Sequence, residues 1–70
     1  MPATDPARLL DVRDVVRSLR VSRSTVYELL RKDPDFPRPI KLGSSTRWLQ
    51  QDLDAYVQTK RRHADIEELL

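Results

Sequence analysis

The sequence predicts one small, mainly helical domain that also contains a β-hairpin. Two stretches, 12–19 and 26–30, have the spacing of amphipathic helices. Their apolar residues recur at i, i+3, i+4 and i+7 in the first and at i, i+3 and i+4 in the second, so each helix has one buried face. Two short β-capable runs, 40–42 and 46–49, then flank a loop that contains the single glycine, which is typical of a hairpin.

Length and composition exclude several classes of protein. Seventy residues without cysteine allow one domain with a small core and neither a disulfide nor a thiolate metal site. The single histidine, His63, has no second ligand type nearby, so we expect no metal and no cofactor. There is no catalytic constellation and no Gly-rich phosphate loop, so we expect no enzyme. No apolar run resembles a membrane span or a signal peptide, which predicts a cytoplasmic protein.

Charge is distributed unevenly along the chain. The net charge is +2, but residues 13–47 carry nine Lys/Arg against four Asp/Glu. From residue 48 onward there are three Lys/Arg against five Asp/Glu. A basic body with an acidic end is typical of a nucleic-acid binder, although ordinary small domains show it too.

The first helix and the turn after it have recognisable capping signals. Asp11 can cap the helix, and Asp14 follows at the spacing of a capping box. Only about three residues around Arg20 separate this helix from the next, which is the arrangement of a helix-turn-helix. Such turns favour glycine, so either Arg20 takes a strained left-handed backbone or the turn is built differently. Three arginines on the outer side could contact phosphates or could simply be solvated: Arg13, Arg17 and Arg20.

The second helix combines an N-cap with a cationic outer face. Ser22 can accept a hydrogen bond from a free backbone N–H of the first turn. Arg23, Tyr27 and Arg31 form an i, i+4, i+8 row opposite the apolar face. Such a row suits a helix in a DNA major groove, and a solvated surface is the alternative. Ser24 and Glu28 lie beside this row.

Three prolines between residues 34 and 39 end the second helix, and the hairpin follows. We expect Phe36 and Trp48 in the core. Alternation predicts that Ile40 and Leu42 point inward and Lys41 outward. Because a hairpin alone is marginal, it should lean on the helices as a wing, which defines a winged helix-turn-helix. The predicted contacts of the wing and its flanks with a minor groove or phosphates are Arg38, Lys41, Ser44, Ser45 and Arg47.

The ends of the chain are less regular. Residues 1–8 are predicted to be a flexible lead-in, with Leu9 and Leu10 packing ahead of the first helix. A third helix should begin near Gln51 and bury Leu53, Tyr56 and Val57. The DNA-binding domain would then span 9–62, and residues 63–70 would extend the third helix, fray or dock on another molecule. The candidate protein-contacting residues in this tail are Ile66, Leu69 and Leu70.

Three segments together resemble a known family. They are LLDVRDVVRSLRVSRSTVYELLRK, then DFPRPIKLG, then RW followed by DLDAYV. In this order the chain resembles the small excisionase/AlpA-like proteins with a MerR-type winged helix-turn-helix, from Leu9 to Val57. The chain departs from the family at Arg20, where glycine is usual, and at Gln51, where a Ser-type cap is usual.

The resemblance implies sequence-specific binding to double-stranded DNA without catalysis. Residues 23–32 would lie in the major groove and the wing at 43–45 in the adjacent minor groove, with Ser22 donating to a phosphate. By matching positions, the resemblance implies these DNA contacts from the second helix: Ser22, Arg23, Ser24, Tyr27, Glu28, Arg31 and Lys32. Small excisionases bind repeated sites side by side, bend DNA and direct a phage integrase towards excision. An integrase, head-to-tail self-association on DNA and a nucleoid location in a bacterial host are therefore expected.

Two other functions stay open at this level. AlpA-like relatives regulate transcription on the same fold, and the residues do not separate this role from an excisionase. A protein-interaction module with a basic surface is the third possibility, and it would bind DNA no better than any cationic protein.

Overall fold

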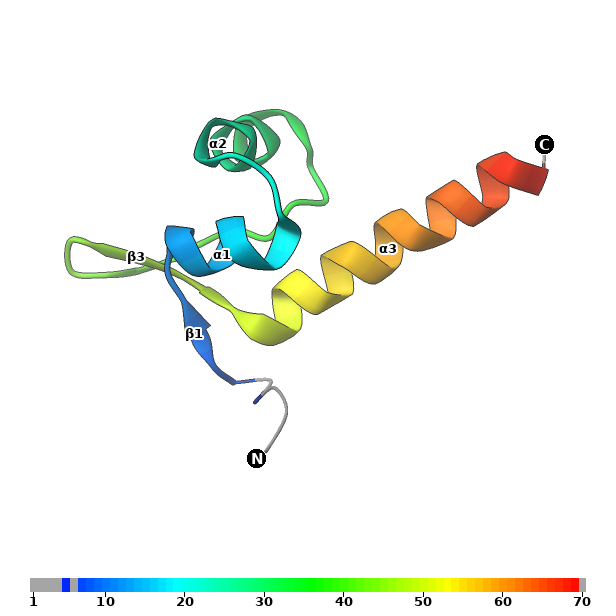
Figure 1. Ribbon diagram of the computed structural model, residues 1–70. Helices are drawn as coiled ribbons and strands as arrows, with labels where there is room; N and C mark the ends of the chain where they lie inside the picture. Colours follow the sequence, from blue (N-terminus) through cyan, green and yellow to red (C-terminus); the bar gives the residue numbers. More distant parts are fainter. Residues whose placement is uncertain (1–4, 6, 70) are drawn as a thin grey trace.

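The structure, a computed structural model, describes residue 5 and residues 7–69, and of residues 65 and 67–69 only the backbone is described. Its elements are β1 (Leu9–Leu10), α1 (Val12–Leu19), α2 (Arg23–Lys32), β2 (Ile40–Leu42), β3 (Ser45–Leu49) and α3 (Gln50–Leu69). The helix pair α1–α2 and the β2–β3 hairpin confirm the predicted winged helix-turn-helix (Figure 1).

The hairpin is part of a three-stranded antiparallel sheet with the order β1-β3-β2. Leu9 pairs with Leu49 and Leu10 with Trp48, so the first strand extends the root of the wing. The sequence predicted packing by Leu9 and Leu10 but no strand. A two-residue strand whose partner lies about 40 residues away leaves no local pattern to detect.

The core lies where the three helices meet one face of the sheet. Its buried residues are Leu10, Val15, Val26, Phe36, Trp48, Leu53 and Tyr56. Trp48 is fully buried, and its indole Nε1 donates to the carbonyl of Pro37 at 3.0 Å. Phe36 packs edge-on against Tyr56 with ring centroids 5.0 Å apart. Trp48 and Phe36 are therefore core residues, as predicted.

The two faces of the sheet are reversed along the wing relative to the prediction. Residues paired across antiparallel strands share a face, and Lys41 pairs with Thr46, two positions before the buried Trp48. Lys41 is therefore on the helix side of the sheet. Ile40 and Leu42 lie on the opposite face and are 36% and 50% exposed, so the predicted inward orientation is wrong. Alternation alone cannot tell which of two faces the helices will cover.

The uncovered face has a mixed apolar and cationic composition. We call it the reverse face; it consists of Leu9, Ile40, Leu42, Ser45, Arg47 and Leu49.

The turn between α1 and α2 is built with a left-handed residue at Arg20, the strained one of the two alternatives that the sequence left open. Asp11 and Asp14 form a capping box at the start of α1. At its end Arg20 has φ 55° and ψ 44°, and its backbone N–H donates to the carbonyl of Val16 at 2.9 Å. An arginine thus takes the strained conformation that a glycine would adopt freely. In the hairpin turn Gly43 has φ 64°.

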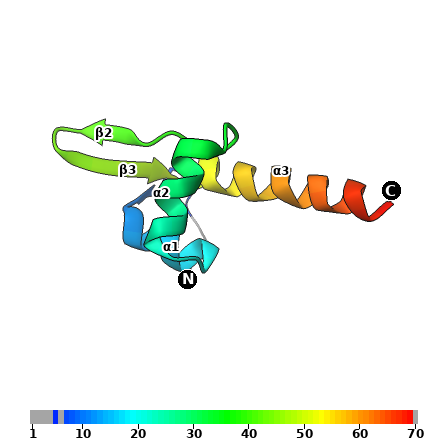
Figure 2. The same ribbon diagram turned by 90° about the horizontal axis from the view of Figure 1, so that it is seen from above.

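Helix α3 follows β3 directly and begins at Gln50. Leu53 and Tyr56 are buried as predicted, but Val57 is 43% exposed, so its predicted burial is wrong. Val57 lines a surface hollow between α1 and α3, together with Leu19 and Leu53, and is not packed under either helix. The helix continues through residues 63–69, and Leu70 lies outside the described residues. The wing and the end of α3 extend in opposite directions from the core (Figures 1 and 2).

Candidate nucleic-acid interface

The outward face of α2 presents a cluster of polar and cationic side chains. Val26 is fully buried, which turns the opposite side of the helix to solvent. The exposed residues on that side are Arg23, Ser24, Tyr27, Glu28, Arg31 and Lys32. Two rows at i, i+4, i+8 spacing lie next to each other on this ten-residue helix. The structure therefore brings together every predicted contact residue within α2.

The charges on this face are available to a ligand. Lys32 donates to Glu28 at 3.3 Å, an exposed pair of a kind that contributes little to stability. Neither Arg23 nor Arg31 forms a salt bridge with any residue whose side chain the structure describes. Two exposed guanidinium groups on one helix face can reach guanine edges or phosphates.

The start of α2 is held by its own cap. Ser22 Oγ accepts from the backbone N–H of Thr25 at 3.1 Å and lies 2.9 Å from Thr25 Oγ1. This confirms the predicted N-cap. As a cap the hydroxyl oxygen is an acceptor, and its hydrogen remains able to point to Thr25 or to a phosphate.

The wing residues divide between the two faces of the sheet. Lys41 Nζ donates to Thr46 Oγ1 at 2.7 Å on the side of the sheet where α2 packs. Ser44 is exposed in the turn. Arg47 and Ser45, by contrast, lie on the reverse face, and the Arg47 guanidinium donates to the carbonyl of Thr46 at 2.8 Å. Lys41 is therefore on the helix side of the sheet, while Ser45 and Arg47 are on the reverse face.

The remaining predicted phosphate contacts are partly engaged within the chain. Arg13 pairs with Asp11, and Arg17 pairs with Asp14, although both arginines are about three-quarters exposed. Arg20 is exposed at the turn. Arg38 donates to the carbonyl of Leu30 at 2.8 Å, so it satisfies an acceptor at the C-terminal end of α2. A cation at this position also complements the helix dipole.

A polar cluster that the sequence did not reveal connects the end of α2 to α3. Asp33 caps α2 through its backbone N–H, which donates to the carbonyl of Leu29 at 2.8 Å. Its carboxylate Oδ2 accepts from Tyr56 Oη and from Lys60 Nζ, each at 2.9 Å. Lys60 also lies 5.6 Å from the centre of the Tyr56 ring. These partners are 23 and 27 residues from Asp33, too far apart for any local pattern to predict.

The cluster changes how its groups titrate. The hydrogen bond from Lys60 lowers the pKa of Asp33 below its ordinary 3.8, and backbone N–H of Asp35 acts in the same direction. The hydrogen bond to Asp33 raises the pKa of Lys60. Burial, with the neighbouring Asp33 carboxylate, raises the pKa of Tyr56. At neutral pH the cluster therefore has an ionised carboxylate, an ammonium group and a neutral phenol.

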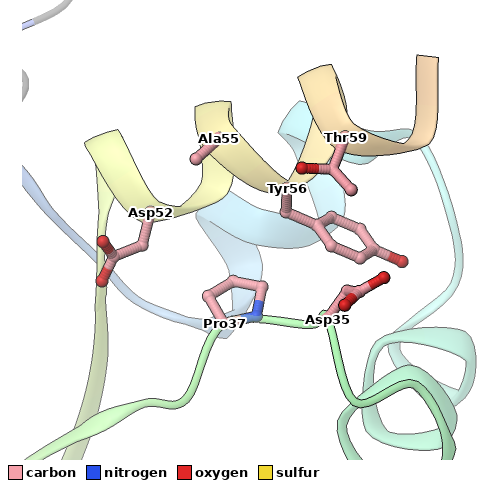
Figure 3. A pocket seen from close by; sticks show the side chains of 6 residues that line it. All are labelled: Asp35, Pro37, Asp52, Ala55, Tyr56 and Thr59. Carbon is pink, nitrogen blue, oxygen red and sulfur yellow. The ribbon is translucent and has the colours of Figure 1, made fainter. Parts of the chain in front are cut away.

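Two surface hollows flank α3. The first, about 280 Å³, lies between the loop after α2 and α3 (Figure 3) and is lined by Asp35, Pro37, Asp52, Ala55, Tyr56 and Thr59. The second, about 420 Å³, lies between α1 and α3 and is lined by Ser18, Leu19, Gln50, Leu53, Asp54, Val57 and Gln58. Among the described residues, none from α2 or from the strands of the wing lines either hollow, so both hollows lie outside the candidate site on α2 and the wing.

The predicted protein-contacting tail lies at the far end of α3. Ile66 is 55% exposed. The side chain of Leu69 and the whole of Leu70 lie outside the described residues. Within the described part of the chain, no helix is both long enough and apolar enough to cross a membrane, and no group of potential ligands could hold a metal ion.

Comparisons with known proteins agree with this geometry. Residues 9–61 match the model of a family described as a helix-turn-helix domain, from β1 into the middle of α3. The chain is also 36% identical over 58 residues to the uncharacterized protein ORF88 of Enterobacteria phage P4, an alignment that covers 81% of this chain. The chain spans 65% of the length of that phage protein. No solved structure matches this chain.

The matched residues include both helices of the motif, the whole wing and the first turns of α3. In helix-turn-helix proteins the second helix of the motif enters the major groove of DNA, and here that helix is α2. The chain therefore belongs to the helix-turn-helix domain family, a DNA-binding family found in the excisionase/AlpA-like proteins that its sequence resembles.

Proposed function

We propose that this protein is an excisionase: a sequence-specific, DNA-bending protein of a phage or mobile element that directs an integrase towards excision. It acts by architecture, without catalysis or a cofactor, in the cytoplasm of a bacterial host. Its partners are double-stranded DNA, a phage integrase and further copies of itself.

The observation that carries the DNA-binding half of the proposal is the exposed, cationic outer face of α2. Arg23 and Arg31 form no ion pair with the described side chains, and their guanidinium groups match the bidentate acceptors of guanine. Lys41, on the same side of the sheet as α2, suits a neighbouring phosphate. The similarity to a phage protein supports the association with a mobile element.

A transcriptional regulator is the second candidate, and the same surfaces favour it. A regulator and an excisionase use one fold to bind DNA, and they differ in which DNA they bind and which protein they recruit. The uncovered reverse face favours the excisionase, because a protein that loads side by side on repeated sites needs a second contact surface besides α2.

The test is a gel shift with fragments tiled across the DNA around the gene, at moderate salt with competitor DNA. An excisionase predicts several discrete shifted bands on an integrase attachment region, together with a change in mobility that depends on where the site lies in the fragment. A single shift on a promoter would identify a regulator instead. Binding that competitor DNA abolishes everywhere would contradict both and leave an interaction module.

A further inference from the structure

The tip of the wing has one large apolar side chain among small ones. The Leu42–Ser45 pair closes the hairpin around a turn that consists of Gly43 and Ser44. Leu42 is 50% exposed, and a Cβ placed on Gly43 would meet no atom within 4 Å. The end of the wing therefore offers a bare backbone at Gly43, two serine hydroxyls and one isobutyl group. Of these four residues, only Leu42 extends well beyond the backbone.

Leu42 does not contribute to the core of the domain. Among the described residues, it is neither in the buried cluster around Trp48 nor among the partly buried residues that pack against that cluster. The hairpin extends away from the helices, with its turn at the far end (Figure 2). Ile40, two positions back along the same face, is 36% exposed. Burial of Leu42 from water therefore requires another molecule.

The charge around the tip favours DNA as that molecule. Between Asp35 and Asp52 the sequence has three cations, Arg38, Lys41 and Arg47, and no carboxylate. Lys41 lies on the helix side of the sheet and Arg47 on the reverse face. Neither forms an ion pair with any side chain that the structure describes. A hairpin with one cation on each face fits the minor groove, which has a row of phosphates along each wall.

An apolar side chain at the end of such a hairpin can kink DNA. Leucine and similar side chains enter between base steps from the minor groove, partly unstack them and bend the duplex towards the major groove. Pyrimidine–purine steps unstack most easily. In this wing, cations on both faces can hold the hairpin against the phosphates, and the missing side chain at Gly43 lets the backbone approach the bases.

We propose that Leu42 is a wedge that inserts between two base pairs from the minor groove and bends the DNA. Because that groove adjoins the major groove occupied by α2, the kinked step lies about five base pairs, half a helical turn, from the centre of the α2 contact. A pyrimidine–purine step is preferred there, so the wing adds specificity without hydrogen bonds to bases. The inference rests on the proposed function and deepens it, since it names the residue that bends the DNA.

The test uses the full-length protein and a duplex of roughly 30 base pairs that contains the specific site found by gel shift. Donor and acceptor fluorophores at the two ends report the bend through energy transfer, and anisotropy of the same duplex reports binding. A second duplex has 2-aminopurine in place of adenine at the proposed step. The fluorescence of 2-aminopurine rises when the base is unstacked, so this duplex reports insertion directly.

The variants separate the wedge from the rest of the reverse face. Leu42→Ala removes the wedge, and Leu42→Met keeps an apolar side chain of similar reach. The matched control is Leu9→Ala, because Leu9 is a leucine of similar exposure, 45%, on the same face at the root of the wing. Both positions are exposed and outside the buried core, so these variants should fold as wild type does.

At saturating protein, Leu42→Ala should lose about half of the bend or more, together with the rise in 2-aminopurine fluorescence. Leu42→Met and Leu9→Ala should retain both signals. Changing the pyrimidine–purine step to a purine–pyrimidine step should weaken binding of wild type about tenfold, whereas Leu42→Ala should bind the two duplexes equally.

Two results would overturn the inference and leave the proposed function standing. One is a wild-type bend in Leu42→Ala, or an equal loss of the bend in Leu42→Ala and Leu9→Ala. The other is specific binding by wild type without any rise in 2-aminopurine fluorescence. A wild-type protein that binds no duplex specifically would refute the proposed function and this inference together.

Discussion

Tyr56 Oη donates a hydrogen bond to Asp33 Oδ2 at 2.9 Å and so joins the third helix to the residue that ends the second. Lys60 reaches the same carboxylate oxygen from one turn further along α3. The face of α2 that carries Arg23 and Arg31 is thereby held from its C-terminal end by a helix that does not itself present the DNA-contacting surface. Through Asp33, α3 helps to fix the orientation of α2.

Tyr56→Phe should lower the free energy of unfolding by about 1 kcal/mol, because it removes one side-chain hydrogen bond and keeps the ring. The edge-on contact of the ring with Phe36 is retained. Urea unfolding followed by circular dichroism measures the change. Tyr27→Phe is the matched control: Tyr27 is 42% exposed, and its loss of a hydroxyl should leave stability unaltered. Equal effects of the two changes would mean that the hydrogen bond to Asp33 does not stabilise the fold.

Acid should remove the contribution of the Asp33 carboxylate to the stability of the fold. Its pKa is lowered in the folded protein, chiefly by the hydrogen bond from Lys60, so the ionised carboxylate stabilises the fold above the ordinary pKa of 3.8. This stabilisation is lost as the pH falls through the lowered pKa. The stability difference between wild type and Asp33→Asn should therefore stay constant from about pH 7 to pH 5 and shrink below pH 3.8. A difference that is independent of pH down to pH 2 would show that the charge on Asp33 is not what stabilises the fold.

Arg20→Gly should raise the free energy of unfolding by about 0.5–1 kcal/mol, since glycine adopts the left-handed backbone of the turn without a Cβ penalty. Part of the gain is offset by the greater freedom of glycine in the unfolded chain. Ser18→Gly, an exposed position inside α1, is the control and should instead destabilise by about 0.5 kcal/mol. Thermal unfolding of both variants gives the comparison. If Arg20→Gly instead destabilises the protein, the Arg20 side chain makes a contact whose stabilising free energy exceeds the cost of the left-handed backbone.

Periodicity and capping signals are sufficient to predict the first two helices and the position of the turn between them. Val15 and Val26 are buried on the faces that their spacing indicated, and Asp11 and Ser22 cap α1 and α2 as their residue types suggested. Each of these features depends on residues within one or two turns of one another, which is the range over which sequence patterns act.

The wrong predictions concern features that depend on contacts between residues far apart in the sequence. Ile40 and Leu42 were assigned to the wrong face because alternation fixes which residues share a face but not which face is covered. The spacing of Val57 from Leu53 predicts burial, yet Val57 lines a surface hollow between α1 and α3 and is 43% exposed. The Asp33 cluster depends on residues from two elements, so only the fold brings it together.

Lys41→Ala should weaken binding to all DNA sequences alike and lower the salt dependence by about one unit in the plot of log K against log salt, because one phosphate contact is lost. Fluorescence anisotropy at several salt concentrations measures the slope. Arg62→Ala, on the exposed part of α3 that extends away from the wing, is the control and should leave the slope unchanged. A slope that changes with Arg62→Ala but not with Lys41→Ala would mean that the DNA lies against α3 and not against the side of the wing that carries Lys41.

The most direct test of the account is the effect of Arg23→Ala on binding to a specific site, measured against competitor DNA with wild type in parallel. If the outer face of α2 contacts base edges, the free energy of binding to the specific site should weaken by about 1–3 kcal/mol, the value of a bidentate arginine contact. The free energy of binding to non-specific DNA should change less. Gln58→Ala, exposed on α3, should bind as wild type does. Wild-type affinity and specificity in Arg23→Ala and also in Arg31→Ala would show that α2 does not contact the DNA through this face.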